Sequence, residues 1–265
     1  MGTDTGIAWT DSTFNSWWGC TAISPACDNC YAESMANRFG TEWGEGKARR
    51  TFDARHWQAP VNWNQSHADF FRRHGRRRRV FSASMSDVFD KDAPPGERDR
   101  LWSLIRSTPH LVWQILTKRI GNVPRMLPAD WGEGYSNVHL GITLANQTEL
   151  ERDLAKLLRV RAAVRFVSAE PLLGPLDFTR ARVAGQHVNA LQPSEHMPRL
   201  DWVIAGGESG PGARPMDIAW ARDIARQCGR HGVPFFMKQL GGVRDKRGRL
   251  EDFPPDLRIR EFPPS

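Results

Sequence analysis

The sequence predicts an α/β fold, namely a partial or complete (β/α) barrel with parallel strands and outer helices. Two observations support this prediction. Short apolar runs alternate with helical stretches at intervals of roughly 25 to 35 residues, which is typical of βαβ units with right-handed crossovers. The runs are nearly continuous in apolar character, as expected for strands buried on both faces.

About seven strands are expected along the chain. The clearest helix is predicted at 147–158, where Thr148 and Glu151 have the form of a capping box. A second is predicted at 217–229, with Gly229 as its C-cap. Two further helical stretches are expected at 94–107 and up to Met126. The strands are predicted near 13–18 and at 80–87, 111–119, 138–143, 164–170, 200–208 and 233–238.

A single domain covering residues 1–265 is expected, with irregular insertions around 40–79 and 177–199 and a proline-punctuated, extended tail from Phe253. No apolar run approaches the roughly 18 to 20 residues that span a bilayer. The first twenty residues lack the layout of a secretory signal. These features predict a soluble, cytoplasmic protein without a membrane partner.

Positive charge is concentrated in one stretch. The chain has 37 Lys and Arg against 30 Asp and Glu, a net charge of +7. Residues 72–79 hold six arginines, without which the balance is +1. Such a patch attracts phosphate backbones. A solvated loop or helix end beside a strand is the competing interpretation.

Three of the four cysteines, Cys20, Cys27 and Cys30, lie within eleven residues. Clustered thiols in a cytoplasmic chain indicate metal ligands or redox groups rather than disulfides. Three thiolates would leave one iron of a cubane cluster open, whereas a closed zinc site needs a fourth ligand. Iron–sulfur, zinc and ordinary thiols all remain possible. Cys228 reads as a buried apolar residue at a helix end, and His56, His67 and His74 are the other candidates for a fourth ligand.

Polar or small side chains stand where the predicted strands end. In a barrel of parallel strands these ends lie on one face, where sites are built, so a shared pocket is expected. Strands leaving into solvent at polar residues are the simpler alternative. The residues concerned are Ser84, Asp87, Thr117, Lys118, Thr143, Glu170, Glu208 and Lys238.

Several motifs together resemble a phage-associated three-cysteine-motif family, a divergent branch of the radical S-adenosylmethionine (SAM) proteins. They are Asn15–Cys20, the spacing Cys-x6-Cys-x2-Cys, Tyr31–Glu33, Met85–Asp87, Leu116–Arg119, Glu170–Pro175 and Gly206–Ser209. The usual radical SAM spacing is Cys-x3-Cys-x2-Cys with an aromatic residue before the last cysteine. This chain has a longer first gap, and Asn29 stands in the aromatic position.

The resemblance implies a radical SAM type of barrel and a radical SAM enzyme, in which Cys20, Cys27 and Cys30 hold a [4Fe–4S] cluster. SAM would bind the open iron, and an electron donor would be required for its reductive cleavage and for hydrogen abstraction from a substrate. Pro25 is expected to stiffen the cysteine loop and Gly19 to permit close backbone approach. Trp17 and Trp18 would shield it from water.

The strand ends receive roles by position in such a barrel. The polar groups of Ser84 and Asp87 would face the SAM amino group. Those of Thr143 and Glu170 would face the ribose. The backbone of Gly206 and Gly207 would contact adenine. Lys118 would pair with a SAM carboxylate or a substrate phosphate, and Glu208 would contact cofactor or act as a cap or rim residue.

The substrate expected from the charge and the resemblance is nucleic acid or a nucleotide, with a nucleobase in phage DNA modified, isomerised or repaired. Three tryptophans interleave with arginines in a composition that can stack bases, although tryptophans at such spacing commonly fill a core. They are Trp43, Trp57 and Trp63, with Arg49, Arg50 and Arg55. The alternatives are a zinc- or cluster-stabilised nucleic-acid-binding protein without catalysis and a host-interaction protein that has lost activity.

Overall fold

The computed structural model describes residues 4–183, 185–195 and 197–264. Seven of its strands form one parallel sheet in the order β1-β4-β5-β6-β7-β10-β11. The α/β prediction is therefore confirmed. Because β1 and β11 stand at the two ends of this order, the sheet is open, which corresponds to the partial rather than the complete barrel.

The strands of the sheet follow the predicted runs to within a few residues. They are β1 (Ser12–Phe14), β4 (Arg78–Ser82), β5 (Leu111–Thr117), β6 (Val138–Thr143), β7 (Val164–Ala169), β10 (Trp202–Gly206) and β11 (Phe235–Gln239). Two small antiparallel pairs lie outside it, β2 (Trp17–Trp18) with β3 (Arg50–Thr51) and β8 (Ala181–Val183) with β9 (Gln186–Val188). The predicted strand near 13–18 is thus two strands, of which only β1 joins the large sheet.

The helices are α1 (Tyr31–Arg38), α2 (Ala54–Gln65), α3 (His67–His74), α4 (Glu97–Ser107), α5 (Val123–Met126), α6 (Gln147–Arg159) and α7 (Ile218–His231). Among the described residues there are also short 3₁₀ turns, namely η1 (Pro25–Cys27), η2 (Ile120–Asn122), η3 (Leu250–Asp252) and η4 (Pro255–Leu257). No helix in the described part of the chain is long and apolar enough to cross a membrane.

Two predicted helix caps are wrong, although α6 begins at Gln147 as predicted. The N-cap of α6 is Asn146, whose side chain accepts a hydrogen bond from the Glu149 amide, so Thr148 lies inside the helix. The C-cap of α7 is Gly232, which adopts φ 60°, and the helix runs through Gly229. A glycine within a helix is tolerated, while the left-handed conformation at the end requires one.

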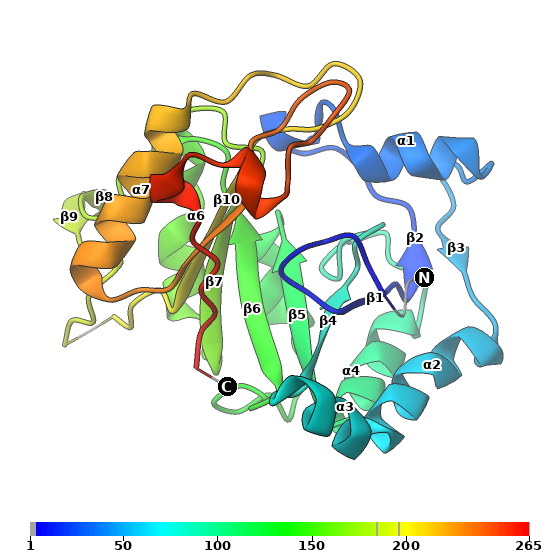
Figure 1. Ribbon diagram of the computed structural model, residues 1–265. Coiled ribbons are helices and arrows are strands. Elements are labelled where there is room, and N and C mark those ends of the chain that lie inside the picture. The colour runs from blue at the N-terminus through cyan, green and yellow to red at the C-terminus, as the bar shows by residue number, and fades with distance from the viewer. Residues whose placement is uncertain (1–3, 184, 196, 265) are drawn as a thin grey trace. The chain divides into compact units, whose positions relative to one another are not determined.

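Contacts divide the chain into two compact units. Within the described residues, the first unit comprises 4–23 and 32–140, and the second comprises 24–31 and 141–264. In the first, the predicted insertion at 40–79 folds into α2 and α3, which pack on α4 and β4 (Figure 1). Its core includes the fully buried side chains of Phe14, Trp102 and Trp113.

In the second unit, α7 packs against β10, β11 and η4 (Figure 1), and α6 packs against β8 of the predicted 177–199 insertion. Phe166, Trp202 and Phe236 are fully buried at its centre. The tail from Phe253 is extended in part: Arg260 bridges to Phe236 of β11, after the short turn η4.

Candidate functional site

In the first unit, Asp87 organises the segments that follow β4 and β5. Its Oδ1 accepts hydrogen bonds from the Phe89 amide (2.9 Å) and the Thr117 hydroxyl (2.7 Å). Its Oδ2 accepts from the Lys118 amide and from Arg119, both at 3.1 Å. Asp87 therefore links the segment after β4 to the end of β5 by hydrogen bonds. Each oxygen of this carboxylate, however, already accepts two hydrogen bonds from the protein, which leaves no acceptor position for a ligand.

Arg119 connects this cluster to the first cysteine. One terminal nitrogen lies 3.3 Å from Cys20 Sγ, and the other donates to the Thr21 carbonyl at 2.6 Å. The Arg119 side chain is only 8% exposed and lies beside the carboxylates of Asp87 and Asp90. Burial lowers its pKa, but these carboxylates outweigh burial and raise it, so the guanidinium is permanently charged.

Arg119 belongs to the Leu116–Arg119 sequence motif, but no role was predicted for it. Burial raises the pKa of the Cys20 thiol to about 11, although the Arg119 charge acts in the opposite direction. A positively charged donor at the sulfur favours the thiolate, which is the form that binds a metal.

Arg49 fixes the loop that carries Cys20. Its buried guanidinium donates to the carbonyl of Cys20 at 3.4 Å and to the Thr21 hydroxyl at 2.8 Å, and it pairs with Asp90 at 2.9 Å. Gly19 has φ 114°, and a Cβ there would lie 2.8 Å from the Arg49 side chain. The expected close approach at Gly19 is thus observed, with an arginine as the neighbour.

Asn15 links the same region to the end of β4. Its amide nitrogen donates to the Ser84 hydroxyl at 3.0 Å, while its oxygen accepts from the Met85 amide at 2.7 Å. Trp17 is buried and Trp18 half-buried beside this segment. Ser84 itself is half-exposed.

In the second unit, Cys27 and Cys30 lie on one turn. The Ser24 side chain caps η1 by accepting from the Ala26 amide, and Pro25 stands at the first position of the turn. The Cys30 amide donates to the Cys27 carbonyl at 3.2 Å, which fixes the spacing of the two residues. Pro25 therefore has the stiffening role expected of it.

The loop after β10 holds this turn. Glu208 accepts hydrogen bonds from Asn29 at 2.9 Å and from Arg214 through three donors at 2.6 to 2.9 Å. Arg214 also donates to the Pro25 carbonyl (2.8 Å) and to Asp28 (2.9 Å). Burial raises the pKa of Glu208, but the bonds from Arg214 and Asn29 more than reverse this and hold it below its usual value.

The remaining predicted strand ends of the second unit also have internal partners. Lys238 and Glu170 form an ion pair at 2.5 Å, with both side chains less than one-fifth exposed. The Gly207 amide donates to the Gln239 carbonyl and its own carbonyl accepts from the Gln239 side chain. A Cβ on Gly207 would lie 2.1 Å from the Leu240 carbonyl oxygen.

Two predicted residues keep polar groups without a partner among the described residues. These are the half-exposed ammonium of Lys118, after β5, and the hydroxyl of Thr143, at the end of β6. The Gly206 carbonyl, by contrast, accepts from the Leu172 amide. Lys118 and Thr143 are thus the strand ends with binding capacity to spare.

The three cysteines of the motif are free thiols of intermediate exposure. Cys20 belongs to the first unit, and Cys27 and Cys30 belong to the second. Within the described residues, no set of three His, Cys, Asp or Glu side chains is placed to hold a metal ion. The donor chemistry nevertheless fits an iron–sulfur cluster, because thiolates are its usual ligands and each part of the motif is held by charged, hydrogen-bonded neighbours.

The other candidate ligands are used elsewhere. Cys228 is fully buried, and burial raises the pKa of its thiol to about 12, consistent with an apolar packing role. His56 Nε2 bonds to the Asn15 carbonyl, His67 stacks on His110, and His74 stacks on Phe70.

The arginine stretch is partly structural. Arg76 pairs with Asp11 at 2.6 Å, and Arg78 lies over the Phe70 ring with its guanidinium carbon 4.4 Å from the centroid. Burial lowers the pKa of Arg79 to about 10. The stretch lies at the amino end of β4, at the opposite end of that strand from Ser84.

The expected base-stacking tryptophans are not a surface feature. Trp57 and Trp63 are buried side chains of α2, and Arg49 is buried as well. Trp43 is half-buried. The core interpretation of tryptophans at this spacing is therefore the correct one for Trp57 and Trp63.

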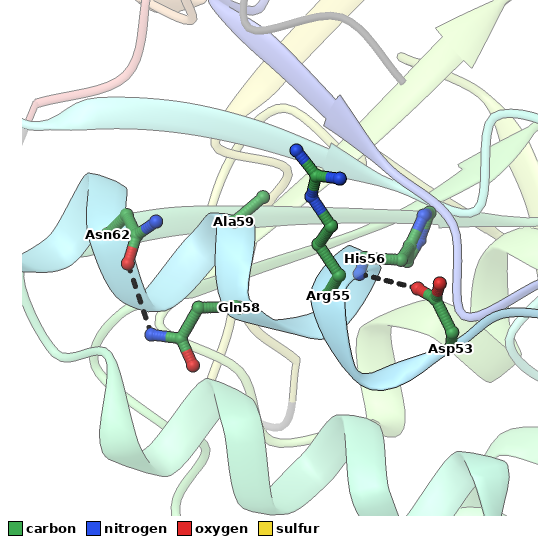
Figure 2. A pocket seen from close by; sticks show the side chains of 6 residues that line it. All are labelled: Asp53, Arg55, His56, Gln58, Ala59 and Asn62. Atoms are coloured by element: carbon green, nitrogen blue, oxygen red, sulfur yellow. Dashed lines mark hydrogen bonds between the residues drawn. The ribbon is translucent and has the colours of Figure 1, made fainter.

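A shallow depression of about 470 Å³ lies on the first unit along α2 (Figure 2). Arg55 and His56 line one part of it, where Asp53 caps the helix by accepting from the His56 amide at 3.0 Å. Gln58 donates to Asn62 at 3.1 Å in another part. Its walls hold no cysteine and none of the predicted strand ends.

The chain belongs to the family described as "Protein of unknown function (DUF5131)", whose model matches residues 4–253. No curated protein matches the chain significantly. Among solved structures, a mutant of spore photoproduct lyase with bound AdoMet and dinucleoside spore photoproduct is similar at 13% identity and a TM-score of 0.39. That match covers 60% of this chain and 45% of the other, so the chain spans less than half of its length. At this identity the similarity assigns no activity to this protein.

Proposed function

We propose that this protein is a radical SAM enzyme in which Cys20, Cys27 and Cys30 hold a [4Fe–4S] cluster. The observation that carries the proposal is the three-cysteine spacing, with Cys27 and Cys30 fixed on one capped turn and a charged donor at the sulfur of Cys20. The cluster, when bound, supplies the electron that cleaves SAM reductively. The resemblance to the phage-associated three-cysteine-motif family supports the same assignment.

The chain's own residues would bind and orient the cofactor. Among the predicted strand-end residues, Lys118 is the cation with no partner within the described residues, so it is assigned to the SAM carboxylate. Thr143 offers its hydroxyl to the ribose. Asp87 acts indirectly, because its carboxylate accepts a hydrogen bond from the Lys118 backbone amide at 3.1 Å and so positions that residue. Replacing Lys118 by Ala is expected to weaken SAM binding about tenfold, the loss of one charge-assisted hydrogen bond.

The test of the chemistry is anaerobic reconstitution with iron and sulfide. The wild-type chain is expected to bind about four irons and to absorb broadly near roughly 400 nm. With SAM and a strong reductant it should release 5′-deoxyadenosine. Cys27→Ala should abolish both results, while Cys228→Ala, which removes a buried thiol outside the motif, should retain them. A chain that takes up iron but forms no 5′-deoxyadenosine would overturn the proposal.

The competing function is a zinc-stabilised nucleic-acid-binding protein without catalysis. Its support is that the same three cysteines are free thiols, which zinc would bind together with a fourth ligand. Protein purified without oxygen should then contain one zinc and no iron. This single analysis separates the two candidates.

For the substrate we propose a nucleobase in DNA. The support is the net charge of +7 and the arginine stretch, in which Arg72, Arg73 and Arg77 are not buried. Because this stretch lies at the amino end of β4, it would contact phosphates away from the reacting base. An Arg72→Ala/Arg73→Ala/Arg77→Ala variant is expected to lose oligonucleotide affinity and to show a shallower salt dependence. Equal affinity in wild type and variant would exclude this surface.

A further inference from the structure

We propose that Arg214 and Glu208 are positioning residues that hold the Cys27–Cys30 turn in the geometry needed for metal binding. This inference rests on the proposed function for its purpose, but not for its structural basis. The sequence placed Glu208 near a cofactor or at a cap or rim. Its hydrogen bonds assign it instead to the cysteine turn.

Glu208 is committed to the protein. Its side chain is 5% exposed, and its carboxylate accepts from Asn29, from the Arg214 backbone amide and from two Arg214 side-chain nitrogens. A cofactor could bind this carboxylate only by displacing these donors. A buried carboxylate with four donors, three of them charged or backbone groups, is a rigid anchor.

Arg214 joins the anchor to the turn. Its guanidinium donates hydrogen bonds to the carbonyl of Pro25, the first residue of η1, and to the Asp28 carboxylate. The Asp28 pair is solvent-exposed and contributes little by itself. The bonds to the Pro25 carbonyl and to Glu208 therefore carry most of the restraint.

Asn29, which lies on the turn itself, is hydrogen-bonded to the same carboxylate. Its amide nitrogen donates to Glu208 at 2.9 Å and to the Gly212 carbonyl at 3.0 Å. Gly212 has φ 77°, and a Cβ there would lie 2.8 Å from Asn29 Oδ1. An asparagine between the two cysteines thus has a partner that an aromatic residue at this position would lack.

The restraint acts on both sulfur ligands of this unit at once. Arg214 holds the residue two positions before Cys27, and Asn29 is the residue immediately before Cys30. Releasing either contact is expected to loosen the backbone of residues 24–31, which the Ser24 cap and the turn's own hydrogen bonds also help to order.

The test uses the full chain without iron. Arg214→Ala is expected to speed amide hydrogen exchange in residues 24–31 about tenfold, as loss of hydrogen bonds to a charged group implies. Alkylation of Cys27 and Cys30 should accelerate in parallel, while Cys20, held by other arginines, should react at the wild-type rate. Asn29→Ala should shift exchange and alkylation in the same direction, and it serves where Arg214→Ala folds poorly.

Arg222→Ala is the matched control. Arg222 forms an ion pair with Asp256 at 2.7 Å in the same unit, and its side chain is similarly exposed. This variant should leave residues 24–31 unchanged. If Arg214→Ala and Asn29→Ala both exchange within twofold of Arg222→Ala, the positioning role is overturned.

Iron loading then separates this inference from the proposed function. If the wild type binds iron, Arg214→Ala should bind less and show an altered electron paramagnetic resonance signal. If the wild type binds none, the proposed function fails, while faster exchange in the variants still establishes the restraint on the turn.

Discussion

Arg49→Met tests whether the buried pair of Arg49 and Asp90 holds the Cys20 loop. Methionine keeps an unbranched, apolar stem but removes the guanidinium, which lies 2.9 Å from Asp90, with both side chains 1% exposed. The variant leaves a buried carboxylate without its main partner. It also removes the donor to the carbonyls of Cys20 and Gly44.

Breaking such a pair typically costs about 3 to 5 kcal/mol. Asp90 keeps Arg119 at 3.9 Å and the Asp92 amide at 3.2 Å, so we expect the lower end, about 3 kcal/mol. Urea unfolding followed by tryptophan fluorescence measures the free energy of unfolding. For comparison, breaking the exposed pair of Arg222 and Asp256 should change the free energy of unfolding far less.

A double variant distinguishes the pair from general disruption of the loop. Asp90→Asn in the Arg49→Met background removes the unpaired charge and should restore a substantial part of the lost stability. A cost below about 1 kcal/mol for Arg49→Met, or no recovery in the double variant, would refute the reasoning.

Three further predictions concern the units separately. Gly207→Ala places a Cβ 2.1 Å from the Leu240 carbonyl oxygen, and the forced backbone shift should destabilise the fold by about 3 kcal/mol, seen as a lower melting temperature. Burial lowers the pKa of His139 to about 4, so between pH 4 and 6.5 the unfolded state binds more protons than the folded state. Stability should therefore rise with pH across that window. His139→Phe should flatten this rise, measured as the urea midpoint at each pH. Burial raises the pKa of Asp11, but Arg76 and a backbone hydrogen bond from Arg79 more than offset this and lower it. The Arg76–Asp11 pair therefore stabilises the fold at pH values above 3.8, and this stabilisation is lost as the pH falls and Asp11 is protonated. Arg76→Met should cost more stability at pH 7 than at pH 3.

Strands such as β6 and β10 were predictable because each is a short, mainly apolar run buried on both faces. The six residues of β6 match the predicted run at both ends. Helix ends were harder because several residues near an end have suitable chemistry. Asn146 and Thr148 are both good N-cap residues, and only the backbone conformation of Asn146 selects it.

The cysteine motif was visible in the sequence because it is local. The groups that hold it were not, since they come from distant positions. Arg49 and Arg119 reach the Cys20 loop across 29 and 99 residues, and Arg214 reaches Pro25 across 189. No periodicity marks these arginines, and nothing in the sequence connects them with the cysteines.

Hydrogen-bond accounting changes what a polar residue at a strand end means. A carboxylate there either contacts a ligand or fixes a neighbouring loop, because its acceptor positions are limited. Asp87 and Glu208 use theirs on backbone amides and arginines, so the loops they hold are rigid before any ligand arrives. Such preorganisation means that less binding energy is spent on ordering the site. The recognition of a ligand then falls to groups that remain unpaired within the described chain, and Lys118 is the cation among the predicted residues that meets this condition.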